Sequence, residues 1–122
     1  MDRFSAGVAA FVFLALVSVP ASARTDTVKG ELVDHACYMK DKKNAGPAHR
    51  ECADTCARKG QPVALVTGEG KVYQITGSLA ADNNAKLAPH MSHTVEITGD
   101  VIEKDGKLTI AAEAGGLKMV SR

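Results

Sequence analysis

Aromatic side chains are scarce in this chain of 122 residues, at 4% of the composition, and tryptophan is absent. The three phenylalanines all precede residue 14, so the rest of the chain has only Tyr38 and Tyr73. The formal net charge is +1, with acidic and basic residues mixed along the chain. A nucleic-acid-binding surface usually combines a basic face with aromatic side chains that stack on bases. We therefore expect no nucleic-acid partner, and a core made of valine, leucine, isoleucine and alanine.

Long apolar runs are also missing. The apolar stretch at residues 6–19 has 14 residues, fewer than the roughly 20 that a membrane-spanning helix needs. It is followed by Ala-Ser-Ala at residues 21–23, the small-x-small pattern that signal peptidase accepts. We predict a signal peptide over residues 1–23, cleaved after Ala23, and a periplasmic or secreted protein with no membrane attachment after cleavage. Residues 24–122 are then long enough for one domain with one small core.

The remaining chain has the alternation and turn residues of a mainly β protein. The alternation is clearest in the fourth predicted strand, and Asp105-Gly106 after it is a strong hairpin signal. The five strands are predicted at residues 27–33, 63–67, 71–76, 94–102 and 108–112. Leu117, Met119 and Val120 form a last apolar segment.

Two helices are predicted between these strands. Residues 47–59 have a proline suited to the first turn, with Gly46 as N-cap and Gly60 as C-cap. A shorter helix is predicted over residues 82–88, capped by Asp82 or Asn83.

This order of elements predicts the fold class. Five short strands with a helix between the third and the fourth match a five-stranded OB-like barrel. Residues 34–61 would then be a helical insertion between the first and second strands. An open β-sandwich or a β-meander is the alternative, because strand order cannot be read from a single sequence.

All three cysteines lie in that insertion. Cys37, Cys52 and Cys56 fall within 20 residues together with His49, and His35 stands just before them. Each helical residue advances about 100°, so on one continuous helix His49, Cys52 and Cys56 would share a face about 60° wide. The segment leaving the first strand can place Cys37 against that face.

A disulfide from Cys37 to Cys52 or to Cys56 is the first interpretation of this cluster. Cys52 and Cys56 are one helical turn apart with parallel Cβ directions, so they are poor partners for each other. A bridge from Cys37 would close a loop of roughly 15–20 residues and stabilise the fold by about 3 kcal/mol. One cysteine would remain free.

A soft-metal site is the alternative, with Cys37, His49, Cys52 and Cys56 as ligands and His35 as a possible addition. Three thiolates and an imidazole form a tetrahedral set for zinc, and thiolates also favour Cu(I). The chain has no Cys-x-x-Cys, which argues against thioredoxin-like activity and covalent haem attachment. No orienting acid or oxyanion donor set is recognisable, so we expect a protein that is not an enzyme.

Three smaller features complete the pattern. Asp34 is expected to cap the turn after the first strand. His90-Met91-x-His93 could add copper ligands, but a Met91 packed into the end of the barrel is the favoured interpretation. The basic run at residues 40–43 is expected to be a solvated loop.

The motifs Asp34-x-x-Cys37 and His49-x-x-Cys52-x-x-x-Cys56, together with Val-Glu-Ile-Thr-Gly at residues 95–99, resemble a group of small exported bacterial domains with OB-like folds. The resemblance implies a fold and an exported location, and no activity. The sequence therefore leaves two functional classes open. The first is an exported binding or interaction module, stapled by a disulfide, for an unknown protein or small ligand. The second is a periplasmic copper- or zinc-binding protein.

Overall fold

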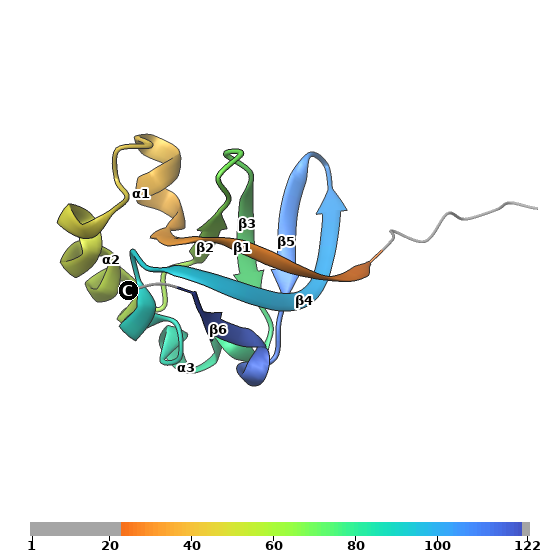
Figure 1. Ribbon diagram of the computed structural model, residues 1–122. Helices are drawn as coiled ribbons and strands as arrows, with labels where there is room; N and C mark the ends of the chain where they lie inside the picture. Colours follow the sequence, from red (N-terminus) through yellow and green to blue (C-terminus); the bar gives the residue numbers. More distant parts are fainter. Residues whose placement is uncertain (1–22, 121–122) are drawn as a thin grey trace, which may run out of the picture.

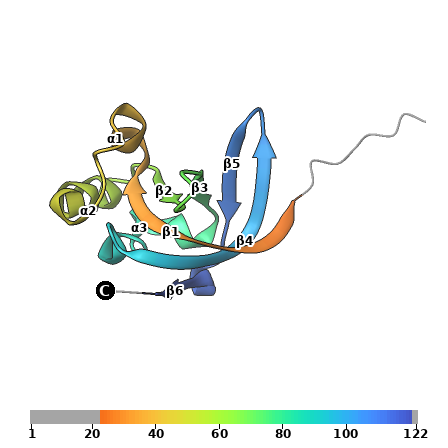
Figure 2. The ribbon, with the colours of Figure 1, turned by 45° about the horizontal axis from the view of Figure 1, so that its top comes forward.

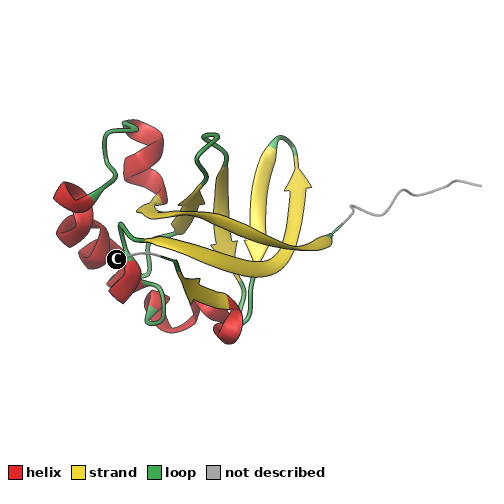
Figure 3. Cartoon of the chain, viewed as in Figure 1, coloured by secondary structure: helices red, strands yellow, loops and turns green. Residues whose placement is uncertain are grey.

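A computed structural model describes residues 23–120, so residues 1–22 of the predicted signal peptide lie outside the described part. The strands and helices are drawn in Figures 1 and 3. The strands are β1 (Arg24–Asp34), β2 (Val63–Val66), β3 (Val72–Thr76), β4 (Thr94–Lys104), β5 (Lys107–Ala111) and β6 (Leu117–Met119). The α-helices are α1 (His35–Lys40), α2 (Arg50–Arg58) and α3 (Ala81–Asn84), and the 3-10 turns are η1 (Pro47–His49), η2 (Ser78–Ala80), η3 (Ala88–His90) and η4 (Ala114–Gly116).

Five of the strands close into a barrel. The order is β1-β2-β3-β5-β4, β1 pairs again with β4, and β3 and β5 run parallel while the other pairs are antiparallel. This confirms the predicted fold class, a five-stranded OB-like barrel with helical insertions. The short β6 is an additional strand on the free side of β4, visible in Figures 1 and 2.

The barrel closes because β1 is long enough to pair with two neighbours. Its first part pairs with β4 and its last part with β2, and Glu31 belongs to both registers. At Gly30, a Cβ atom would lie 2.4 Å from the carbonyl oxygen of Val66. Only glycine lets the two backbones approach this closely.

The main core fills the barrel and its α2 end. Val95 and Ile97, which alternate with polar residues in the sequence, are fully buried. Ala53 and Ala57 of α2 close the barrel end together with Leu87 and Met91. Since these alanines have no bulk beyond Cβ, α2 lies close against the strands.

A second, smaller core lies on the outer face of the sheet. Tyr38 of α1 is buried against Val33 and Ala64, with Val66 and Val72 at its margin. The insertion between β1 and β2 therefore packs in two ways, with α2 on the barrel end and α1 on the outer face.

The helices differ from the prediction in three places. The helix predicted over residues 47–59 is divided into η1 and α2, while Gly60 has the expected left-handed conformation at φ 84°. A short helix does lie between β3 and β4, but it is α3 at Ala81–Asn84, so the predicted bounds of 82–88 are wrong. Asp82 and Asn83 have φ values of 55° and 54° in place of helical ones, and neither caps a helix. The third difference is α1 at His35–Lys40, a helix that was not predicted from the sequence.

Candidate functional site

The cysteine cluster is organised around Asp34, the last residue of β1. Its side chain is only 2% exposed, and its Oδ1 accepts a hydrogen bond of 2.8 Å from the backbone N–H of Cys37. This contact caps α1, as predicted for Asp34. The cap fixes the first turn of α1 and holds Cys37 next to a buried carboxylate. The sequence signal for this arrangement is the spacing Asp-x-x-Cys at the end of a strand.

The other two thiols lie on one flank of α2. The buried stripe of the helix is Ala53 and Ala57; at about 100° per residue, Cys52 and Cys56 lie beside it on one flank. Cys52 is exposed and Cys56 is half-buried. Cys56 is therefore the α2 thiol that lies deeper in the structure.

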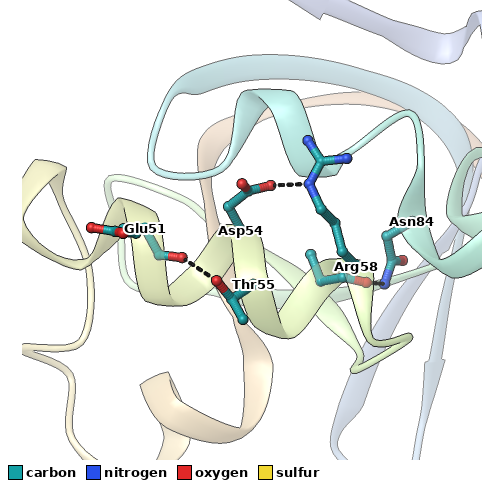
Figure 4. Close-up of polar contacts among 6 residues, drawn as sticks. Glu51, Asp54, Thr55, Arg58 and Asn84 are labelled. Atoms are coloured by element: carbon teal, nitrogen blue, oxygen red, sulfur yellow. Dashed lines mark hydrogen bonds and ion pairs between the residues drawn. The ribbon is translucent and has the colours of Figure 1, made fainter.

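Polar contacts fix the rest of α2 (Figure 4). Arg58 Nε and Asp54 Oδ1 form an ion pair of 2.8 Å. At about 100° per residue, this pair is on the other flank of α2 from Cys52 and Cys56. At the C-terminal end, the Asn84 side-chain amide donates to the carbonyl oxygens of Ala57 and Gln61 at 2.9 and 2.8 Å. These contacts leave the thiol flank facing the end of β1.

Electrostatics shows that the three thiols and Asp34 are neighbours. A side-chain hydrogen bond with Asp34 is the largest of the effects that raise the pKa of Cys37, followed by burial and the charges of Asp34, Cys56 and Cys52. Burial is the largest effect that raises the pKa of Cys56, followed by the charge of Asp34 and by the charge and a hydrogen bond of Cys52. These effects place the three thiols in the same region of the fold, where no disulfide joins any two of them.

Raised pKa values limit the chemistry of this cluster. All three cysteines are free thiols in the structure. Because the thiolate is the nucleophile, a raised pKa leaves less of Cys37 and Cys56 in the reactive form at neutral pH. A thiol with a raised pKa is also a poor leaving group, so a disulfide made from two such thiols resists exchange.

The predicted metal ligands are only partly brought together. His49 belongs to η1, before α2 begins, and its Nε2 is buried with no hydrogen-bond partner. It is not among the groups that perturb the thiols. His35 begins α1 and lines a separate surface hollow with Met39. Within residues 23–120, no three histidine, cysteine or carboxylate side chains are placed to hold one metal ion.

The second histidine motif lies against the first turn of α2. Met91 is 1% exposed within the main core, which agrees with its favoured interpretation as a packing residue. Burial lowers the pKa of His93, and the nearby charges of Arg50 and His90 lower it further. Since the positive charge of Arg50 lies near the imidazole of His93, this motif is a poor place for a metal cation.

Comparison with protein-family models, with curated protein sequences and with solved structures finds no match for this chain. The resemblance noted from the motifs thus stays a prediction. Among the helices of the described residues, none has the length and apolar character needed to cross a bilayer.

Proposed function

We propose that this protein is an exported, non-catalytic binding module in which a disulfide between Cys37 and Cys56 fastens the helical insertion to the barrel. The observation that carries the proposal is that the buried carboxylate of Asp34 raises the pKa of both Cys37 and Cys56, as expected for two thiols in the same region of the fold. Export is supported by the signal-peptide pattern at residues 1–23. In an oxidising compartment, neighbouring thiols in a small domain commonly form such a bridge.

The choice of partner follows from burial and helix geometry. Cys52 and Cys56 belong to the same helix, one turn apart, which disfavours a bridge between them. Cys56 is half-buried and perturbs Cys37 more than Cys52 does, while Cys52 is exposed to solvent. The proposal therefore leaves Cys52 as the free thiol. On oxidation, Cys37 and Cys56 lose two protons and two electrons to a disulfide oxidant of the export compartment, which is reduced to two thiols.

The bridge would support binding by fixing α1. Only six residues make up this helix, and its contact with the barrel is mainly Tyr38 in the outer core. A covalent link at Cys37, less than one turn from every residue of α1, would keep the helix in place beside β3. Any ligand that contacts both α1 and the barrel would then meet a preorganised surface.

The test uses exported protein purified without chelator or reductant. The expected result is an intact mass lower than the fully reduced value by two hydrogen atoms, one thiol that reacts with iodoacetamide, and no stoichiometric metal. Three reactive thiols would contradict the bridge. About one copper or zinc per chain, lost on Cys56→Ser substitution, would instead support the soft-metal alternative.

A further inference from the structure

A hollow of about 430 Å³ lies on the outside of the barrel, where α1 faces β3 and β5. Figures 1 and 2 show α1 on one side of β3 and the β4–β5 hairpin on the other. The residues that line the hollow are His35, Met39, Lys71, Val72, Gln74, Gly106, Lys107, Leu108 and Thr109. Its volume is in the range of pockets that take small organic ligands.

The apolar part of the hollow is adaptable and partly unpartnered. Met39 is 63% exposed, more than any other large hydrophobic residue of residues 23–120. It lines the hollow together with Val72, a half-buried residue of β3 whose side chain is on the outer face of the sheet. A flexible thioether beside a fixed aliphatic side chain can adjust to an apolar body of variable shape.

The charged part of the hollow has one sign. Lys71 and Lys107 line it, and no carboxylate is among its lining residues. Lys71 Nζ lies 3.9 Å from Oε2 of Glu69, which is outside the hollow, and both side chains are more than half exposed. An exposed pair at this distance contributes little, so Lys71 can turn to another anion. The amide of Gln74 adds a neutral donor at the same wall.

We propose that this hollow binds a small organic anion, with its apolar body along Met39 and Val72 and its carboxylate at Lys71 and Lys107. The inference rests on the proposed function as a binding module and names the class of ligand that the module takes. A carboxylate satisfies the two ammonium groups through charge-assisted hydrogen bonds. An aliphatic chain covers the exposed thioether, which a purely polar anion would leave in water.

Titration calorimetry of the exported protein with sodium decanoate and, separately, with decan-1-ol tests the charge requirement. We expect decanoate to bind about tenfold more tightly than the alcohol, which has the same chain without the charge. The variants Lys71→Gln and Lys107→Gln should each weaken decanoate binding about fivefold and leave the alcohol unchanged. Lys86→Gln is the matched control, an exposed lysine outside the hollow, and should change neither value.

The apolar requirement is tested by Met39→Ser, which should weaken both ligands, with unchanged urea midpoints showing that each variant is folded. Absence of decanoate binding, equal affinity for acid and alcohol, or lysine variants that bind like the wild type would overturn the inference. The disulfide state of each sample is fixed first by intact mass. If the protein has the disulfide but does not bind decanoate, the anion-binding inference is refuted and the disulfide is not. If the protein has three free thiols and binds decanoate, the disulfide is refuted and the anion-binding inference is not.

Discussion

Loss of the bridge should lower stability by an amount that can be worked out from the position of the two cysteines. A link from Cys37 to Cys56 closes a loop of roughly 20 residues, for which the chain-entropy relation gives about 3 kcal/mol. Oxidation also removes the thiol hydrogens that the Asp34 carboxylate can accept, which costs about 1 kcal/mol. The net stabilisation is then about 2 kcal/mol, or about 8–16 °C in melting temperature for a domain of this size.

Urea unfolding with and without dithiothreitol measures this difference. In the wild type and in Cys52→Ser, reduction should lower the free energy of unfolding by about 2 kcal/mol. In Cys37→Ser and Cys56→Ser, reduction should have no effect, because neither variant can form the bridge. The serine hydroxyl at position 37 still offers Asp34 a donor, so the comparison isolates the covalent link. A Cys37→Ser protein that remains sensitive to reductant would refute the assignment.

Three further predictions concern the surroundings of the cluster. Asp34→Asn keeps the cap of α1 but removes the negative charge, so the pKa of both half-buried thiols should fall and reduced protein should alkylate faster at a given pH; an unchanged rate would contradict this. Asn84→Asp turns a donor into an acceptor against the carbonyl of Ala57 and should cost about 2–4 kcal/mol in urea unfolding; a cost below about 1 kcal/mol would contradict it. Because burial lowers the pKa of His93 in the folded state, the free energy of unfolding should fall as pH drops below about 6.5. Arg50→Gln should reduce that fall, and an equal fall in both proteins would contradict the role of Arg50.

Local patterns were sufficient to predict the strands of the barrel. Val95 and Ile97 alternate with polar residues because one side of β4 faces the core. Asp105 and Gly106 both have positive φ, which is why the Asp-Gly pair marks the hairpin so clearly. The strand order could not be read from the sequence, since closure of the barrel depends on the long pairing of β1 with β4.

The helical segments were harder because long-range contacts decide them. Asp82, Asn83 and Asn84 are three successive left-handed residues, and the Asn84 side chain holds them by bonding to a carbonyl 27 residues away. No local signal predicts such a run, although asparagine and aspartate tolerate the conformation best. The helix α1 has only six residues and one buried side chain, Tyr38, too few for an apolar period to be visible.

The sequence predicted the cysteines of the candidate site and the capping role of Asp34, but not the position of His49. Helix spacing placed Cys52 and Cys56 on one flank, and the short segment after β1 brought Cys37 to them. His49 was placed on the same face only under the assumption of one continuous helix, and the break between η1 and α2 removes that assumption. The role of Asp34 depends on its burial, which is a property of the assembled barrel.

Peptide mapping of the exported protein under non-reducing conditions tests the central claim most directly. After blocking with iodoacetamide, trypsin releases residues 30–40 with Cys37 and residues 51–58 with the other two cysteines. The account predicts that these peptides are joined, and that fragmentation places the link on Cys56 and the carbamidomethyl group on Cys52. Separate peptides with all three cysteines blocked, or a link on Cys52, would contradict it.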